Sequence, residues 1–217
     1  MKKKILSLTI GPVLVLGLIT IVLMLTMVKD SMMDEVQEAL KGTAAATLAA
    51  YDQNTGDYIE SSNGDIWKGS YNISKSESLV DRIKENSGMD VTFFYGDRRI
   101  MTSALDDNGE RILNSPAGER IVEKVLNGGE EYFSKAVSLE GELNYGYYMP
   151  VYQNGTTDQI IGMVFVGTNK KLKDAVVNKI LGSIILAVCI VMLICIVVAA
   201  KLSTSMTKNI RVSIGVV

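Results

Sequence analysis

Two uninterrupted apolar runs stand at opposite ends of this 217-residue chain, at residues 5–28 and 180–200. They are 24 and 21 residues long, and neither contains an Asp, Glu, Lys or Arg. A helix that rises about 1.5 Å per residue needs about 20 apolar residues to cross a hydrocarbon core of about 30 Å. Each run is therefore predicted to form a transmembrane helix, the form in which a lone segment satisfies its own backbone. We expect five segments: residues 1–4, 5–28, 29–179, 180–200 and 201–217.

Cations next to the two runs predict the orientation of the chain. Three precede the first run and three follow the second: Lys2, Lys3, Lys4, Lys201, Lys208 and Arg211. Both termini are expected in the cytoplasm, which makes this a two-pass protein of the plasma membrane with an extracytoplasmic central segment. Lysines at the ends of that segment do not oppose this, because segments longer than about 60 residues translocate largely regardless of charge. A cleaved signal peptide is the alternative, but the first run exceeds the usual apolar length of about 7–15 residues and lacks an Ala-x-Ala site.

Composition excludes several classes of function. The chain has no histidine, so it cannot form a histidine-ligated zinc site or a Ser-His-Asp triad. Cys189 and Cys195 both lie in the second apolar run, which leaves the central segment without disulfides. A net charge of −2 without a basic cluster argues against nucleic-acid binding. We expect no cofactor, no metal and no enzymatic activity.

The central segment begins with a helical pattern. Apolar residues recur every four positions, at Met32, Val36, Leu40, Ala44 and Leu48. This spacing predicts an amphipathic helix that continues the first transmembrane helix to about residue 50. Its apolar stripe can pack on its own domain or form a dimer seam, and the sequence leaves both open.

The rest of the central segment alternates between helical and strand patterns. A loop-rich passage is expected at 52–78, and helices are expected at 79–86 and 117–126. Strands are expected at 91–95, 99–105, 132–139, 144–152 and 160–167, with turns at 140–142 and 153–157. Five strands and these helices predict one α+β domain. The last strand is apolar throughout, as is typical of a central strand that is covered on both faces.

Three segments carry a resemblance to a known family. They are DVTFFYGDRRIMT at 90–102, YGYYMP at 145–150 and IGMVFVG at 161–167. Together they resemble the single Cache sensor domains of bacterial methyl-accepting chemotaxis proteins over residues 32–169. The resemblance implies a PAS-like antiparallel sheet of five to six strands with a long N-terminal helix, flanked by two transmembrane helices. It also implies a membrane-distal pocket for a small-molecule ligand and a homodimer.

Residues 201–210 resemble the first turns of a HAMP linker, after which the sequence stops. The family resemblance implies a cytoplasmic coiled coil that engages a chemotaxis kinase and an adaptor. We expect the sequence to be a fragment of such a receptor; a receptor without an output module is the alternative. Sensor kinases and cyclic-dinucleotide enzymes also carry Cache domains, so the output is left open.

Arg99 is the first candidate for ligand binding, because a guanidinium forms bidentate bonds to a carboxylate and stays charged. Citrate and dicarboxylate sensors of the family hold their ligand with an Arg-x-x-His pattern, which Arg99-Ile100-Met101-Thr102 resembles with Thr102 in place of histidine. The ligand is therefore expected to be an organic acid or a related metabolite, not citrate in particular. Arg98 and Arg99 point to opposite faces if both lie in a strand, and which one faces the pocket is left open.

The strand at 144–152 supplies further candidates. Relatives place a ligand-binding arginine near the position of Tyr147, and a tyrosine there could stack or donate a hydrogen bond. The full set of candidates is Arg99, Thr102, Tyr147, Tyr145, Tyr95 and Phe93. Core packing is the alternative for the aromatic residues, and a surface ion pair is the alternative for the arginine. A ligand that bridges Arg99 and the tyrosine strand is expected to shift the last strand and, through it, the second transmembrane helix.

The sequence leaves two other classes of function open. A membrane-anchored domain that docks a partner protein or a structural component is the runner-up, and an exposed apolar patch without a cavity would favour it. An enzyme is a remote third, because the acidic pairs Asp106-Asp107 and Glu130-Glu131 lie at turn positions where solvated charge is usual.

Overall fold

The computed structural model describes residues 2–139 and 141–214; the side chains of residues 2–6, 8, 9 and 206–214 are not described. It divides into two compact units. The sheet unit is Met33–Asp174, and the two-helix unit is Met1–Met32 with Ala175–Val217. Of the expected segments, residue 1, residue 140 in a turn and residues 215–217 of the HAMP-like stretch lie outside the described residues.

The two-helix unit is formed by parts of two long helices, α1 (Lys2–Asp52) and α4 (Lys170–Ile214). Their stretches Ile10–Asp52 and Lys170–Ser205 are long and apolar enough to cross a membrane. The helices pack closely at Gly17, where a Cβ would lie only 1.9 Å from the Met192 Sδ. A side chain at position 17 would require the flexible Met192 side chain to move aside.

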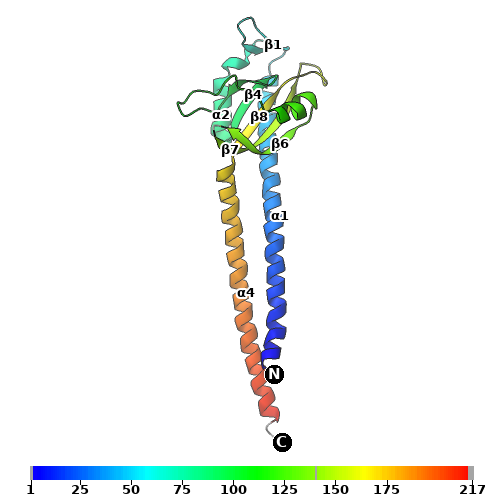
Figure 1. Cartoon of the computed structure of the whole chain (residues 1–217), viewed down its shortest axis with the longest axis vertical. Helices are drawn as coiled ribbons and strands as arrows, with labels where there is room; N and C mark the ends of the chain where they lie inside the picture. Colours follow the sequence, from blue (N-terminus) through cyan, green and yellow to red (C-terminus); the bar gives the residue numbers. More distant parts are fainter. Residues whose placement is uncertain (1, 140, 215–217) are drawn as a thin grey trace. The chain divides into compact units, whose positions relative to one another are not determined.

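The sheet unit contains a five-stranded antiparallel sheet with the strand order β5-β4-β8-β7-β6 (Figure 1). Its strands are β4 (Asp90–Tyr95), β5 (Arg98–Thr102), β6 (Tyr132–Leu139), β7 (Glu142–Tyr152) and β8 (Ile160–Asn169). The prediction that the last strand is central is confirmed: β8 pairs with both β4 and β7, and its residues from Gly162 to Thr168 are buried. The fold is α+β with a long N-terminal helix, as predicted.

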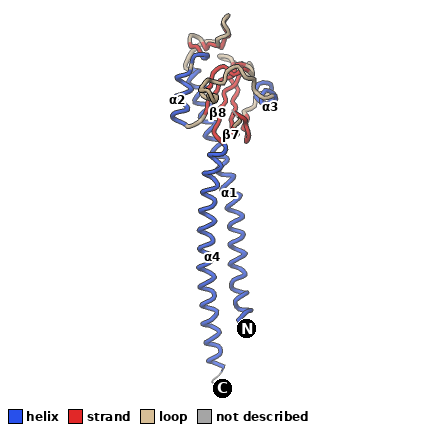
Figure 2. The backbone as a smooth tube through the Cα atoms, turned by 60° about the vertical axis from the view of Figure 1, so that its left-hand side comes forward, coloured by secondary structure: helices blue, strands red, loops and turns tan. Residues whose placement is uncertain are grey.

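Two separate cores cover the two faces of the sheet. Residues that alternate along each strand divide between them, so that Phe93 belongs to the first core and Phe94 to the second. The first face packs against α1 and α2 (Glu77–Ser87). The second face packs against α3 (Glu119–Ile121) and the π-helical turn η2 (Val122–Asn127). Figure 2 shows α2 and α3 on opposite sides of the sheet.

The helical stripe of the N-terminal segment packs on its own domain. Leu40 and Ala44 of α1 are fully buried in the first core, and Val36 and Leu48 pack against its edge. The domain-packing alternative for this stripe is thus observed. Because the buried residues follow the predicted four-residue spacing, the amphipathic helix was predictable from the sequence alone.

The passage at 52–78, expected to be rich in loops, contains a small second sheet. It contains β1 (Tyr58–Glu60), β2 (Ile66–Lys68) and β3 (Tyr71–Asn72), and the short helix η1 (Ile73–Lys75) follows it. The Gln153 side chain accepts a bond from the Tyr58 backbone N–H and donates one to the Tyr58 carbonyl. This pair of bonds fixes the small sheet to the loop between β7 and β8.

Two expected elements differ in detail, one in its type of helix and one in its end. The helix predicted at 117–126 is a short α-helix followed by a π-helical turn, because the N–H of Gly128 bonds the carbonyl of Glu123, five residues earlier. The strand predicted at 99–105 ends at Thr102. A register shift at Phe93/Phe94 bends this edge, and the chain then leaves the sheet to form the loop that lines the site described below.

Candidate functional site: a cavity beside Arg99

Arg98 and Arg99 are neighbours in the sequence but have different surroundings. The Arg98 guanidinium forms an ion pair of 2.6 Å with Glu60 of β1. The Arg99 guanidinium lies over the Phe94 ring, 5.5 Å from its centroid, and donates a 3.5 Å hydrogen bond to the Ile112 carbonyl. Because Phe94 belongs to the second core, Arg99 is the arginine on the second face of the sheet.

A cavity of about 510 Å³ opens beside the Arg99 side chain. Its walls come from β5, the loop at 103–118 and the end of β6. The lining residues are Arg99, Asp106, Asp107, Ile112, Ser115, Pro116, Ser138 and Leu139. Its volume is within the range of cavities that hold small molecules.

Backbone hydrogen bonds hold the 103–118 loop along β5. The Arg99 N–H donates to the Ser115 carbonyl at 3.1 Å, and the Asn114 N–H donates to the Arg99 carbonyl at 2.8 Å. Asn114 has a φ of 62°, a left-handed conformation that asparagine tolerates better than most residues. This turn brings Ser115 and Pro116 back beside Arg99 and so forms one wall of the cavity.

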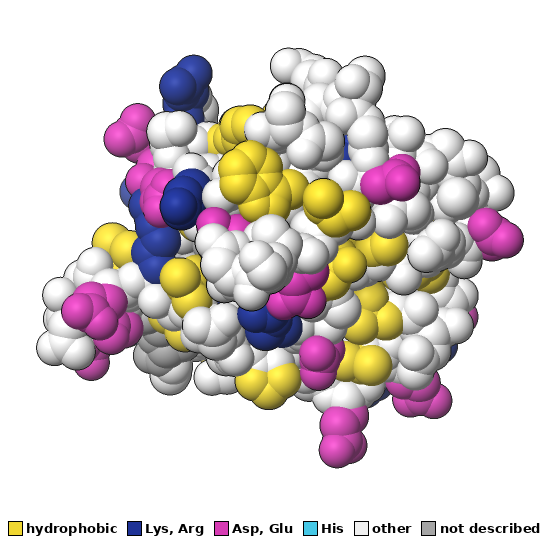
Figure 3. Space-filling model, turned by 90° about the horizontal axis from the view of Figure 1, so that it is seen from above, with side chains coloured by type: hydrophobic (Ala, Val, Ile, Leu, Met, Phe, Trp, Pro, Cys, Tyr) yellow, Lys and Arg dark blue, Asp and Glu magenta, His cyan; other side chains and the backbone are white. Residues whose placement is uncertain are grey.

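The cavity carries charges of both signs. The Asp106 carboxylate accepts the backbone N–H groups of Asn108 at 2.9 Å and Glu110 at 2.8 Å. These bonds, above all the one from Glu110, hold the pKa of Asp106 below its ordinary value, so the group is ionised at neutral pH. With Asp107 beside it, the wall presents two carboxylates and the Arg99 guanidinium. On the face of the molecule seen in Figure 3, basic side chains likewise lie beside acidic ones.

Tyr148 is a further polar residue on the Arg99 face. Its ring packs on Phe165 with the centroids 4.8 Å apart, and its side chain is almost entirely buried. Burial raises the pKa of Tyr148, while the positive charge of Arg99 acts in the opposite direction. Within residues 2–139 and 141–214 its hydroxyl has no hydrogen bond.

Thr102 lies on the same face of the sheet as Arg99, but its hydroxyl already forms hydrogen bonds within the sheet unit. It is fully buried, and its Oγ1 lies 2.7 Å from the Thr92 Oγ1. The same oxygen accepts the Ala104 N–H at 3.2 Å. The structure therefore brings Thr102 near Arg99 while giving its hydroxyl a role in holding β5 to β4.

Phe93 and Tyr95 lie on the opposite face, in and beside the first core. The Phe93 ring is fully buried between Tyr51, at 5.2 Å, and Tyr58, at 5.8 Å between centroids. The sequence left two alternatives for Phe93, the pocket wall and the core. In the structure Phe93 is a core residue.

Tyr145 and Tyr147 also belong to the first face. The Tyr145 hydroxyl donates to Asp174 at 2.6 Å, and the Tyr147 hydroxyl donates to Glu131. The sheet separates both from Arg99, so one ligand cannot contact Arg99 and Tyr147 together. On this strand Tyr148 belongs to the Arg99 face of the sheet, but it is not among the residues that line the cavity.

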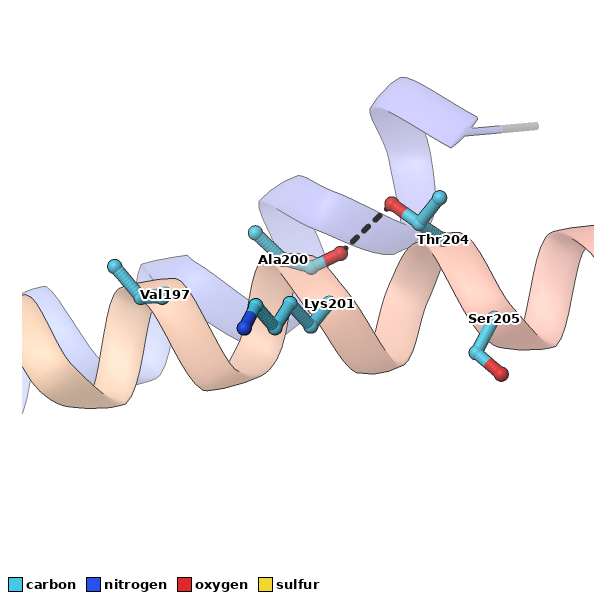
Figure 4. A pocket seen from close by; sticks show the side chains of 5 residues that line it. All are labelled: Val197, Ala200, Lys201, Thr204 and Ser205. Atoms are coloured by element: carbon cyan, nitrogen blue, oxygen red, sulfur yellow. Dashed lines mark hydrogen bonds between the residues drawn. The ribbon is translucent and has the colours of Figure 1, made fainter.

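A second hollow of about 600 Å³ lies along α4 (Figure 4). All five of its lining residues come from that one helix: Val197, Ala200, Lys201, Thr204 and Ser205. The Thr204 hydroxyl bonds the Ala200 carbonyl of the preceding turn at 2.8 Å, and Lys201 supplies the one charge among the five. Since the described residues that line it all come from one helix, whereas the cavity beside Arg99 is lined from several elements, the latter is the candidate site.

The sequence analysis proposed Arg99, which the structure places in the cavity wall, but it did not propose the other residues that line the cavity. Asp106 and Asp107 were interpreted as solvated turn residues, and the turn interpretation is right for the backbone. Their position opposite Arg99 depends on the path of the 103–118 loop, for which no local pattern exists. The alternation of side chains along β7 was a usable signal for Tyr148, because it places Tyr147 and Tyr148 on opposite faces.

Comparison with solved structures gives distant similarities. The ligand-binding domain of the Campylobacter jejuni chemoreceptor Tlp3, in complex with L-valine, is 11% identical with a TM-score of 0.45 over 81% of this chain and 66% of that one. An extracellular ligand-binding receptor from Desulfohalobium retbaense is 15% identical with a TM-score of 0.44 over 69% of this chain and 26% of that one. The chain therefore spans less than two thirds of either structure. No curated protein sequence matches it.

A family match covers the part of the chain that contains the site. The model of single Cache domain 3 matches residues 71–180, which include every strand of the main sheet, the 103–118 loop and Arg99. The match covers half of the chain. The chain belongs to the single Cache domain 3 family.

Proposed function

We propose that this chain is the sensory region of a transmembrane chemoreceptor that binds a small extracellular metabolite in the cavity beside Arg99. The observation that carries the proposal is the position of Arg99, a guanidinium in the wall of a small-molecule-sized cavity in a Cache domain. A guanidinium in such a place is suited to a carboxylate, because it offers two parallel donors and a permanent charge.

The charges of the cavity narrow the ligand class further. One guanidinium and two carboxylates leave the wall with a net negative charge, which disfavours a polyanion such as citrate. A ligand with one carboxylate for Arg99 and one ammonium group for Asp106 or Asp107 pairs with the guanidinium and with one of the two carboxylates. Small α-amino acids are such ligands.

Three matched compounds test the cavity directly. L-Valine, 3-methylbutanoate and isobutylamine share a branched carbon skeleton but carry both charges, the carboxylate alone and the ammonium alone. A ligand that binds the native state raises the melting temperature by mass action. We expect the largest rise for the amino acid, a smaller rise for the acid and none for the amine or citrate. If no compound in a wider set of amino and organic acids shifts the midpoint, the metabolite-binding proposal fails.

A pair of variants separates Arg99 from its neighbour. Arg99→Gln is expected to abolish the rise, whereas Arg98→Gln is expected to keep it, because Arg98 is paired with Glu60 outside the cavity. A rise that survives Arg99→Gln would move the ligand to another part of the domain.

The proposal includes the membrane setting of the domain. We place α1 and α4 across the plasma membrane, residues 29–179 outside it and both termini in the cytoplasm, with the chain acting as a homodimer. The cations at the two chain ends and the apolar stretches of both helices support this placement. The signal would pass through α4 and a HAMP-like linker at 201–217 to a methyl-accepting module that engages a chemotaxis kinase and an adaptor.

A further inference from the structure

Two tyrosines of β7 connect the sheet to both long helices. Tyr145 and Tyr147 stand two residues apart on the first face, and each is at most 3% exposed. Both rings are buried, while each hydroxyl reaches a charged side chain at the edge of the unit. We call these two residues the tyrosine pair.

Tyr145 contacts the first turn of α4. Its hydroxyl donates to the Asp174 carboxylate at 2.6 Å and accepts from the Lys170 ammonium at 2.7 Å. The Lys170 ammonium also lies over the Tyr145 ring, 4.1 Å from its centroid. Charge-assisted hydrogen bonds of this kind are stronger than those between neutral groups. The first turn of α4 is thereby fixed to β7 by side chains as well as by the continuous backbone from β8.

Tyr147 contacts α1 through one intermediate residue. Its hydroxyl donates to the Glu131 carboxylate, and the same oxygen of Glu131 accepts from the Lys41 ammonium of α1 at 2.5 Å. Burial and the bond to Glu131 raise the pKa of Tyr147 to about 12, so the hydroxyl keeps its proton at neutral pH. The second tyrosine thus links β7 to the other long helix.

We infer that the tyrosine pair positions α1 and α4 against β7 and sets the resting arrangement of the two apolar helices. β7 pairs with β8 along its length and carries Tyr148 on the opposite face, toward Arg99. A change on the Arg99 face that moves β7 therefore acts on α1 and α4 through these two hydroxyl contacts, in addition to the continuous backbone from β8 to α4. Tyr145 and Tyr147 are positioning residues in this scheme and do not bind the ligand.

A pair of cysteines introduced into the two-helix unit can report the arrangement of the two helices. Gly17 and Met192 face each other so closely that a Cβ at position 17 meets the Met192 side chain. In a chain with Cys189→Ser and Cys195→Ser, the substitutions Gly17→Cys and Met192→Cys therefore place two thiols together. Position 192 is 22 residues from Lys170, about 33 Å along α4 at about 1.5 Å per residue. Loss of a hydrogen bond at Tyr145 changes the rate of cross-linking between positions 17 and 192 only if the start of α4 determines where the rest of α4 lies relative to α1.

The experiment compares oxidative cross-linking rates of full-length chains in lipid nanodiscs, without any ligand. Tyr145→Phe and Asp174→Leu each remove the Tyr145–Asp174 hydrogen bond with little change in side-chain shape, and Tyr147→Phe removes the contact toward α1. We expect each to change the rate by about fivefold, the ratio for one lost hydrogen bond. Tyr152→Phe is the matched control on the same strand, because its hydroxyl has no hydrogen bond within residues 2–139 and 141–214.

Two results would overturn the inference. Equal rates in the reference chain and the three variants would show that the contacts are local, and an equal change in Tyr152→Phe would show general loosening of the sheet. Melting temperatures measured on the same samples confirm that each variant is folded. The inference rests on the proposed receptor function, but the test uses no ligand, so its failure is distinct from a failure of metabolite binding.

Discussion

The Arg111 guanidinium donates two hydrogen bonds to the Asp81 carboxylate, 2.9 Å to Oδ1 and 2.6 Å to Oδ2. The same guanidinium donates to the Thr102 carbonyl at 2.6 Å. Arg111 belongs to the loop that lines the cavity, whereas Asp81 belongs to α2 and Thr102 ends β5. This geometry fixes the middle of the loop to α2 and β5, in addition to the backbone hydrogen bonds of the loop.

Asp81→Asn is expected to loosen the cavity loop without unfolding the domain. It removes the charge of a bidentate pair whose carboxylate is 45% exposed, so the cost is about 1 kcal/mol. Hydrogen exchange of the loop amides is expected to rise about fivefold, with little change in β8. Arg82→Gln on the same helix is the control. Unchanged exchange in Asp81→Asn would show that the loop is held by its backbone alone.

Thr102→Val separates a structural role of this residue from ligand binding. The substitution keeps the shape but leaves the buried Thr92 hydroxyl and the Ala104 N–H without their partner. We expect a loss of about 1–3 kcal/mol in the free energy of unfolding, measured by urea denaturation. The order of preference among L-valine, 3-methylbutanoate and isobutylamine is expected to stay the same; a changed order would assign Thr102 to the ligand.

Much of the fold could be predicted because local patterns and long-range packing agree. The four-residue spacing around Leu40 and Ala44 predicted the helix that covers the sheet, and both residues are fully buried. The apolar run at 160–167 predicted a central strand. In these elements the local pattern already indicates which residues face the core.

The site was less predictable because it depends on which face each side chain occupies. Arg99 was identified from its chemistry, but its position relative to Tyr147 follows from strand pairing and from the register shift at Phe93/Phe94. The π-helical turn also escaped prediction, because apolar spacing cannot distinguish bonds to the fifth residue from bonds to the fourth. Cavity walls formed by a loop have no period that a sequence can display.

Acid stability is expected to depend on Lys41 and Glu131. The hydrogen bond from Lys41 holds the pKa of Glu131 below its ordinary value of 4.5. Because the folded pKa is the lower one, this contribution is fully present above pH 4.5 and is lost as the pH falls through the folded value. We expect Lys41→Gln to reduce the fall in melting temperature between about pH 5 and about pH 3.

Part of that fall is expected to persist, because hydrogen bonds also lower the pKa values of Asp65 and Asp106. The control is Lys135→Gln, which changes an exposed lysine that has no ion pair in the described part of the chain. An acid profile that is the same for both variants would contradict a stabilising Lys41–Glu131 pair.

The proposed topology can be tested by thiol labelling in intact cells. In a chain with Cys189→Ser and Cys195→Ser, Ser62→Cys places a thiol on the exposed turn between β1 and β2. A membrane-impermeant maleimide is expected to label this position before lysis and to label Ser205→Cys only after lysis. The reverse pattern would invert the orientation and contradict the assignment from terminal cations.

Gly162→Ala is expected to be among the most damaging single changes in the sheet. A Cβ at this position would lie 2.0 Å from the Phe94 carbonyl oxygen of the adjacent strand, and a backbone atom cannot move aside as the end of a side chain can. We expect a loss of about 3 kcal/mol through displacement of β4 from β8.

Gly42→Ala is the opposite case, because Gly42 lies in α1 with no atom within 4 Å of the new Cβ. Replacing a helical glycine by alanine there is expected to stabilise the chain by about 0.5–1 kcal/mol. Urea denaturation of both variants checks the two signs, and a neutral Gly162→Ala would show that the close pairing of β4 with β8 is not needed for stability.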